Sequence, residues 1–245
     1  MEQKQFRENG YVLLRGFFSD SELAEIESFL WTFHEEWLKN NRAAYEKGIL
    51  NSHSITSGNM VTPNQRLSLF AFISQDKIKR LTEALFPAKA FFLNSQLFFD
   101  PYNSSQPNYW HRDIQYTGMS ISQQQESIQK QTVLHFRIPL KPEPGIELIP
   151  GTHQNWDLNE ELETRLSLNG RKPSDNLARS VTIPLKRGDL LIFSANMVHR
   201  GLYGADRFTF DLIFCDDTPE FRNFTDVANQ PNDSEISLIP NRDLF

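Results

Sequence analysis

The chain of 245 residues is long enough for one large domain or two small ones, and its apolar share of 39% suffices for a sizeable core. A net charge of -6 and a sequence without a Lys/Arg cluster argue against nucleic-acid binding. No apolar run approaches the roughly 18 residues of a membrane span, and the first residues contain no apolar signal core. Cys215 is the only cysteine, which excludes an intrachain disulfide framework. We therefore expect a cytoplasmic protein without a membrane partner, whereas the oligomeric state is not predicted.

The N-terminal part predicts a short strand over residues 11–15 and then a helix from about residue 20 into the high thirties. Ser19 precedes Glu22 by three positions, which is the capping-box signature of a helix start. Apolar side chains recur at helical spacing after it and should pack on the core. They are Leu23, Ile26, Leu30, Phe33 and Trp37.

The next segment, residues 41–66, is polar, contains glycine and proline as breakers and is predicted to be irregular. A second, short helix is predicted from Gln75 to Leu85. The chain then changes to short β-rich runs separated by Pro, Gly, Asn and Asp. The predicted strands are Ala90–Phe99, Thr132–Leu140, Glu147–Ile149, Val181–Ile183, Leu190–Phe193 and Phe208–Phe214. Cys215 follows the last of them and is expected to be buried and inert.

This order of elements predicts a mostly β fold with flanking helices, namely a sandwich or barrel with helices packed outside. No internal repeat, low-complexity tract or linker divides the sequence, so we expect one domain over residues 1–245. Within it, residues 1–89 would form a mainly helical support and residues 90–215 the β core. The polar tail, residues 216–245, would fold over the core as a lid or wrap around it.

Two triplets in the sequence place a carboxylate two residues after a histidine. For a chain of this composition, the number of such triplets expected by chance is about 0.8. His34 and Glu36 lie within the predicted N-terminal helix, where residues two apart do not share a face. We therefore expect His34 to be a surface or helix-packing residue. His111 and Asp113 lie in an extended context, and alternate residues of a strand point to the same side. Their imidazole and carboxylate can therefore converge on one metal ion.

The third metal ligand is predicted to be His199, which follows a Gly-Asp turn and a buried strand and would begin the strand that returns to the interior. His53 lies in a polar segment and is expected to be exposed, and His153 is expected to be a loop residue. His135 lies on a predicted strand. We expect it to have a structural role or to support the ligands, with a contact to co-substrate or substrate as the alternative.

Two imidazoles and one carboxylate leave positions open on a divalent metal, which suits a non-haem Fe(II) oxygenase. Arg207 begins the strand after His199 and could pair with the far carboxylate of a 2-oxo acid, because guanidinium groups bind carboxylates in a bidentate fork. Arg112, between the first two ligands, is expected to point away from the metal and to form a salt bridge at the rim.

Four segments together resemble a known family, the phytanoyl-CoA dioxygenase family of Fe(II)/2-oxoglutarate-dependent oxygenases. Their order and spacing carry the similarity, which spans most of the chain up to Arg207 and its strand. They are Asn9–Phe17 near the start, the Trp-His-x-Asp segment Trp110–Asp113, the Pro-Gly-Ser/Thr-His stretch from Pro144 to His153, and the distal-histidine segment from Gly188 to Gly201.

The resemblance implies a double-stranded β-helix (jelly-roll, cupin-like) core in which His111, Asp113 and His199 bind Fe(II). It also implies 2-oxoglutarate and O₂ as co-substrates, with Arg207 binding the 5-carboxylate of 2-oxoglutarate. The interval from His199 to Arg207 is shorter than in many relatives, so Arg200 is the alternative for this role.

Three more residues are implied as co-substrate contacts. Thr209, two residues past Arg207, lies where relatives often have a hydroxyl that helps to hold the same carboxylate. The family also uses a polar side chain on the strand before the His-x-Asp motif. Asn94 matches that position best, and Gln96 on the same strand face is the second choice.

The reaction that the resemblance implies is hydroxylation of a small-molecule metabolite, with release of succinate and CO₂. Asp113 favours this outcome over halogenation, because related halogenases lack this carboxylate, and desaturation or ring modification is the alternative outcome. Two other hypotheses stay open: a non-catalytic metal- or ligand-binding barrel, and a metal-dependent barrel enzyme that does not use 2-oxoglutarate. The primary substrate is not predicted, because fold and family do not fix it. Candidates for the lining of its pocket are Phe98, Phe99, Tyr102, Tyr109, Tyr116 and Phe136, although core packing is the commoner role of such residues.

Overall fold

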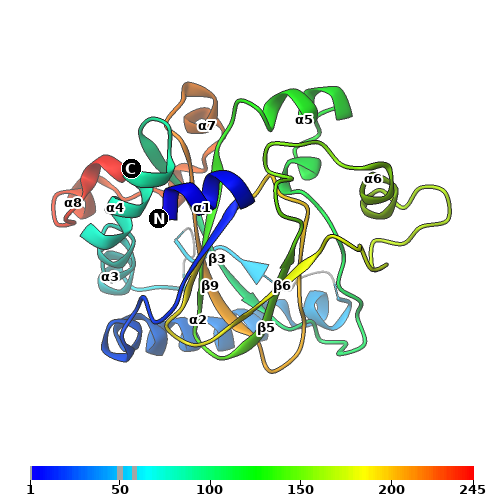
Figure 1. The fold of residues 1–245 in the computed structure, drawn as a ribbon. Coiled ribbons are helices and arrows are strands. Elements are labelled where there is room, and N and C mark those ends of the chain that lie inside the picture. Colours follow the sequence, from blue (N-terminus) through cyan, green and yellow to red (C-terminus); the bar gives the residue numbers. More distant parts are fainter. Residues whose placement is uncertain (1, 49–51, 57–59) are drawn as a thin grey trace.

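The computed structural model describes residues 2–48, 52–56 and 60–245, and these form two antiparallel sheets with helices around them (Figure 1). The larger sheet has the strand order β1-β7-β4-β9-β3-β2, and the smaller has the order β6-β5-β8. The strands are β1 Tyr11–Leu14, β2 Ser52–His53, β3 Ala90–Phe99, β4 Val133–Pro139, β5 Glu143–Leu148, β6 Val181–Leu185, β7 Leu190–Ser194, β8 His199–Gly201 and β9 Phe208–Asp216. Each of the six predicted β-rich runs overlaps one of these, and so does the short strand predicted over residues 11–15.

Helical residues outnumber strand residues in the described part of the chain, so the expectation of a mostly β fold suits only the segment from β3 to β9. The α-helices are α1 Glu2–Asn9, α2 Asp20–Glu46, α3 Pro63–Ile73, α4 Asp76–Leu85, α5 Ile121–Ser127, α6 Asn159–Arg165, α7 Pro219–Phe224 and α8 Asp233–Ile236. Three short 3-10 helices, η1 Asp113–Tyr116, η2 Val227–Asn229 and η3 Arg242–Leu244, complete the structure. None of the helices among these residues has both the length and the apolar character that a membrane span requires.

Helix α2 begins where the sequence predicts, because Ser19 and Glu22 form both hydrogen bonds of the capping box. Its apolar stripe is buried in the main core cluster, as expected. The helix continues to Glu46 across a break in helical geometry at Asn41. The prediction of irregular structure is therefore wrong for residues 41–46. The same prediction of irregular structure misses α3. Two signals in the sequence mark its start, namely the capping box of Thr62 and Gln65 and the proline Pro63 in the first turn.

Strands β4 and β9 lie in the middle of the larger sheet and separate the core from the candidate site. On β4, Leu134 and Phe136 face the main core cluster, whereas His135 and Arg137 line a cavity on the other side. On β9, Phe210, Leu212 and Phe214 likewise join the core, and Asp211 and Ile213 line the cavity. The alternation of strand side chains therefore places the apolar core residues on the helix-covered face. It places His135, Arg137 and Asp211, together with Ile213, on the face that is turned toward the smaller sheet.

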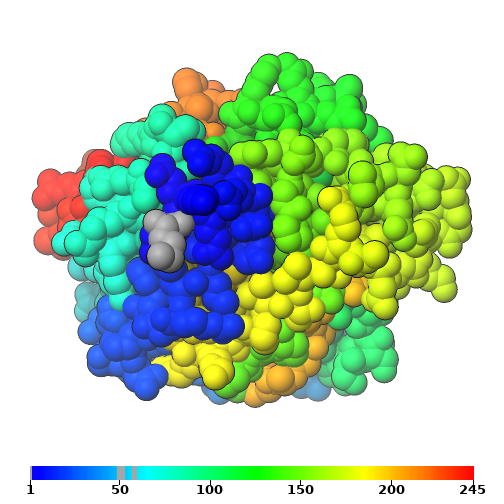
Figure 2. All heavy atoms as spheres, viewed as in Figure 1, coloured from blue at the N-terminus to red at the C-terminus, as the bar shows by residue number. Residues whose placement is uncertain are grey.

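The terminal segments pack on the outside of this framework. Figure 2 shows the N-terminal residues beside the segment that holds α3 and α4, and α1 packs against β1 and α4. Helix α7 lies at the same end of the molecule as α5 (Figure 1). Cys215, at the end of β9, is buried as predicted, and this burial raises the pKa of its thiol.

Candidate metal centre and the two adjoining cavities

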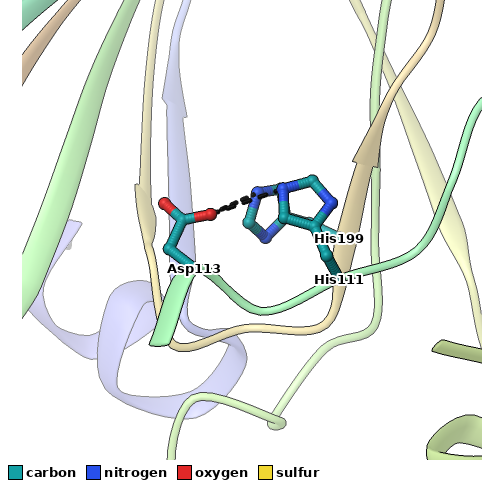
Figure 3. A group of neighbouring side chains, drawn as sticks. All are labelled: His111, Asp113 and His199. Atoms are coloured by element: carbon teal, nitrogen blue, oxygen red, sulfur yellow. Dashed lines mark ion pairs between the residues drawn. The ribbon is translucent and has the colours of Figure 1, made fainter. Parts of the chain in front are cut away.

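His111, Asp113 and His199 form a compact group whose three candidate ligand atoms all lie within 4.8 Å of one another (Figure 3). Nε2 of His111 is 3.4 Å from Oδ1 of Asp113, and Nε2 of His199 is 3.5 Å from the same oxygen. The predicted convergence of these three side chains is therefore present in the fold.

The backbone places the three residues through two contacts. His111 and His199 form an antiparallel bridge, in which each N–H donates to the other's carbonyl at 2.9 Å. The sequence suggested that Asp113 lies on a strand, but it is the first residue of η1. Its N–H donates to the carbonyl of Ala195 at 3.1 Å. Extended backbone therefore positions the two histidines, whereas the turn into η1 directs the carboxylate toward them.

Both histidines present Nε2 to the site because Nδ1 is held elsewhere. Nδ1 of His199 lies 3.0 Å from the carbonyl oxygen of Met197, and Nδ1 of His111 lies 3.2 Å from that of Tyr109. A carbonyl only accepts, so each Nδ1 carries the proton and each Nε2 offers a lone pair. Burial, with the neighbouring His111, lowers the pKa of His199 to about 3, which keeps this imidazole neutral as a metal ligand must be.

Asp113 has a second partner, His135 of β4. Nε2 of His135 is 2.8 Å from Oδ2 of Asp113, and its Nδ1 is 3.1 Å from Oδ2 of Asp211. Burial alone would lower the pKa of His135, but its hydrogen bonds to these two carboxylates raise it to about 9. Burial would likewise raise the pKa of Asp113, but the adjacent imidazole of His111, the hydrogen bond from His135 and the nearby His199 hold it well below its usual value.

The hydrogen-bonded chain continues into the interior through Arg137. Its guanidinium donates to both oxygens of Glu143, at 3.1 and 3.2 Å, and to Oδ1 of Asp211 at 3.4 Å. Thr209 is fully buried and donates to Glu143 at 2.7 Å, away from the cavity lining. This arrangement was not predicted, although the alternation of charged and apolar residues on β4 and β9 contains the signal for it.

A cavity of about 380 Å³ lies between the two sheets and contains the triad. We call it the inner cavity. The larger sheet contributes Gln96, Phe98, His135, Arg137, Phe193, Asp211 and Ile213, and the smaller sheet contributes Ile146, His199 and Gly201. Residues outside the strands complete the lining: His111, Asp113, Tyr109, Tyr116, Tyr203 and Arg207.

Arg207 is 4% exposed, and its guanidinium is not saturated by protein groups. Nη2 donates to the carbonyl of Phe99 at 2.8 Å, whereas Nε has no hydrogen-bond partner and lies 3.9 Å from Asp100. Burial, and then the charge of Arg137, lowers the pKa of Arg207. A side chain at Gly201 would place its Cβ 2.8 Å from Nη1, so the glycine leaves room for the guanidinium. A buried cation of this kind fits an incoming carboxylate.

The two other arginines weighed from the sequence lie outside the cavity lining. Arg200 pairs with Glu147 and stacks on Trp110, so it is placed poorly for the carboxylate contact that the sequence led us to expect of Arg207. Arg112 does point away from the triad, but it is fully buried and not at a rim, which corrects the prediction. It pairs with Asp157 at 2.8 Å and donates to backbone carbonyls that include that of Thr152 at 2.5 Å.

A second cavity of about 610 Å³, the outer cavity, adjoins the first. Both are lined by Asp113, His135, Gln96, Tyr116 and Ile213. Asn94, the preferred co-substrate contact from the sequence, lines only the outer cavity, and its Oδ1 accepts hydrogen bonds from Ser54 and the N–H of Ser95. Gln96, the second choice, is therefore nearer to the triad's cavity. The register shift between Phe92 and Asn94 in the pairing of β3 with β9 is a local irregularity that the sequence did not indicate.

The remaining predictions on histidines and aromatic residues can be placed as well. His34 is buried and packs against Phe99, as a helix-packing residue should. His53 was expected to be exposed, but its ring stacks on Phe33 and Trp37, at centroid distances of 4.6 and 4.9 Å. His153 lies in a turn, where Nε2 is 3.3 Å from the carbonyl oxygen of Arg7.

Of the six aromatic candidates for the substrate pocket, Phe98, Tyr109 and Tyr116 line a cavity, Phe99 and Phe136 belong to the core, and Tyr102 is 55% exposed.

Comparisons with known proteins agree with this geometry. The model of a family described as phytanoyl-CoA dioxygenase (PhyH) matches residues 6–202. No curated protein matches the chain.

Among solved structures, AviO1 from Streptomyces viridochromogenes Tue57 is 15% identical, with 89% of this chain and 94% of that chain covered and a TM-score of 0.57. EctD from S. alaskensis, solved with 2-oxoglutarate and 5-hydroxyectoine, is 16% identical over 94% of this chain and 77% of that chain, with a TM-score of 0.57. SnoN, a non-haem α-ketoglutarate-dependent epimerase from nogalamycin biosynthesis, is 18% identical over 89% and 82%, with a TM-score of 0.53. At these identities the structural likeness shows a shared fold.

Proposed function

We propose that this chain, which belongs to the phytanoyl-CoA dioxygenase family of non-haem iron(II)- and 2-oxoglutarate-dependent oxygenases, hydroxylates an unactivated C–H bond of a small-molecule metabolite. The observation that carries the proposal is the triad His111, Asp113 and His199, in one cavity with the buried guanidinium of Arg207. The proposal includes a double-stranded β-helix core, which the position of this cavity between the two sheets supports.

The donor set fits iron(II). His111 and His199 offer Nε2 lone pairs and Asp113 offers Oδ1, and three protein ligands of this kind leave three positions open. When bound there, iron(II) with 2-oxoglutarate and O₂ supplies the oxidising power, so that one oxygen atom enters the substrate and the other enters succinate as CO₂ is released.

The chain's own residues bind and orient the co-substrate. Arg207 would bind the 5-carboxylate of 2-oxoglutarate, because its Nε has no hydrogen-bond partner and its position beside Gly201 is enclosed. Gln96 lines the same cavity and could contact the other end of the molecule. Arg137 is less suited to the carboxylate, since Glu143 and Asp211 already occupy its guanidinium.

We also propose that residues 1–245 act as one domain whose tail, residues 216–245, covers the outer cavity. In support of this, Phe221 and Phe224 of α7 and Asn229 of η2 form part of the cavity wall. A substrate bound there would lie beside Asp113, which faces both cavities.

Measuring succinate formation from 2-oxoglutarate tests the proposal. Asp113→Ala is expected to abolish turnover, whereas Glu35→Ala, on the exposed face of α2, should leave it unchanged. Normal turnover by the Asp113→Ala protein would refute the proposal. Arg207→Ala should raise the KM for 2-oxoglutarate, whereas an activity that this substitution leaves unchanged would indicate a metal enzyme that does not use this co-substrate. A product heavier by one oxygen atom identifies hydroxylation, and one lighter by two hydrogen atoms identifies desaturation.

A further inference from the structure

The outer cavity differs in charge from the inner cavity, and this difference indicates a class of substrate. We infer that the primary substrate is an organic cation, an amine or ammonium compound with an apolar body, and not an acyl-CoA ester. The inference rests on the proposed function, because it takes the outer cavity as the place where the primary substrate meets the metal centre.

The position of the outer cavity supports this role. It shares Asp113, His135, Gln96, Tyr116 and Ile213 with the inner cavity, so a molecule in it would lie against Asp113 of the triad. Its volume of about 610 Å³ lies within the range of about 300–1,000 Å³ that small-molecule sites occupy. The inner cavity, by contrast, holds Arg207 and is the place for the dicarboxylate.

Asp113 and His135 line both cavities, and the charged groups that line only one of the two differ in net sign. Arg137 and Arg207 line only the inner cavity, together with the single carboxylate of Asp211. In the described part of the chain, no lysine or arginine lines the outer cavity, whereas the carboxylates of Glu220 and Asp226 line it and not the inner one. The basic residues next to this lining in the sequence are paired with acidic neighbours: Lys130 with Glu126, and Arg222 with Asp217.

The carboxylates at the outer cavity keep accepting capacity. Asp226 caps η2 through Oδ1, which accepts from the N–H of Ala228 at 2.9 Å. Glu220 accepts from Nε2 of Gln131 at 3.1 Å through Oε2. An ionised carboxylate can accept about four hydrogen bonds, so one such contact leaves each free to bind an ammonium group.

Apolar and aromatic side chains form the rest of the wall. Leu93, Ile114, Met119, Val133, Phe221 and Phe224 line it together with the ring of Tyr116. Aromatic rings beside carboxylates favour cations, because the ring face carries partial negative charge. The phosphate groups of a CoA ester would need arginine or lysine partners, and here they would meet carboxylates instead.

A labelling experiment measures this preference directly. Val133→Cys places a thiol on the wall of the outer cavity, at a half-buried position of β4, and Thr225→Cys provides a second site in the same wall. The native Cys215 is buried and serves as a silent background. The protein, loaded anaerobically with Fe(II) and 2-oxoglutarate, is treated with trimethylammonioethyl or with sulfonatoethyl methanethiosulfonate, and the two labelling rates are compared at low salt.

The cationic reagent is expected to react faster than the anionic one by about tenfold, after normalisation to the rates with a free thiol. Adding Glu220→Gln and Asp226→Asn should remove most of that ratio. Adding Glu25→Gln and Glu35→Gln, which changes the net charge equally on the exposed face of α2, should preserve it. A ratio near one, or a ratio that survives the loss of Glu220 and Asp226, would overturn the inference.

A screen of metabolites by stimulated succinate release provides the second arm. Activating compounds are expected to be cations, and activation by an acyl-CoA ester or another organic anion would overturn the inference. The labelling ratio does not depend on turnover, so it remains interpretable if Asp113→Ala leaves 2-oxoglutarate consumption unchanged and the proposed function fails.

Discussion

Nε2 of His135 lies 2.8 Å from Oδ2 of Asp113, while Oδ1 of the same carboxylate faces Nε2 of both His111 and His199. The two carboxylate oxygens of Asp113 therefore have different partners. His135 holds one oxygen by a hydrogen bond, and only the other is directed at the position of the metal. Because Asp211 in turn holds Nδ1 of His135, the imidazole cannot rotate freely away from this contact.

We therefore predict that His135 positions the carboxylate ligand. Removing this hydrogen bond in His135→Phe should weaken iron(II) binding by about 10- to 100-fold, measured by anaerobic competition with a chelator. His135→Gln retains a donor and should recover part of the loss. His34→Phe, a change of a buried histidine in the core, should bind iron like the wild type. Equal iron affinity in all four proteins would show that His135 only fills space.

Gly201 is predicted to leave the space in which the guanidinium of Arg207 is positioned to bind the co-substrate. A Cβ at this position would lie 2.8 Å from Nη1 of Arg207 and would displace the guanidinium. Gly201→Ala should therefore raise the KM for 2-oxoglutarate by roughly tenfold or more, because small misplacements of an orienting group cost much binding energy. Iron affinity should not change. A KM equal to that of the wild type would mean that Arg207 does not bind the co-substrate in this position.

His34 is predicted to make the fold sensitive to acid. Burial lowers its pKa from 6.5 to about 4, so the unfolded chain takes up a proton below pH 6.5 while the folded chain does not. The stability is therefore complete above pH 6.5 and is lost as the pH falls from 6.5 toward 4. At about pH 5 this one group should account for a loss of about 2 kcal/mol. Urea unfolding at about pH 7.5 and pH 5 should show a smaller loss in His34→Phe than in the wild type, and an equal loss would contradict the assignment.

Arg112 is predicted to be a structural residue, in spite of its position between two ligands. It is fully buried with Asp157, and Arg165 contacts the same carboxylate at 2.7 Å. Arg112→Ala should reduce the free energy of unfolding by about 3–5 kcal/mol, because it leaves buried partners unpaired. Arg171→Ala breaks the exposed pair with Glu160 and should cost less than about 1 kcal/mol. Urea unfolding of the two variants checks this difference, and similar losses would refute it.

The sequence predicts those parts of the molecule that depend on local pattern. The capping pair Ser19 and Glu22, the six β-rich runs after residue 89 and the triplet with His111 and Asp113 are all recognisable from spacing, because each involves neighbours in the chain. Helix α3 is missed although Thr62, Pro63 and Gln65 signal its start, because the preceding polar segment suggested irregular structure throughout.

Contacts between distant segments are not predictable in this way. The link from Asp113 to His135 and Asp211 spans three elements, and only the fold brings them together. The burial of Arg112 likewise depends on Asp157, which lies 45 residues away. The pairing of Thr209 with Glu143 arises from the same kind of tertiary contact, so spacing from Arg207 alone could not show it.

An anaerobic titration with Fe(II) and 2-oxoglutarate tests the central claim most directly, because it requires the triad and the co-substrate site together. We predict that a visible charge-transfer band of the chelated co-substrate appears with the wild-type protein and is lost in His199→Ala, while a folded protein is retained. A wild-type protein that gives no such band, or a band of unchanged intensity in His199→Ala, would contradict the account.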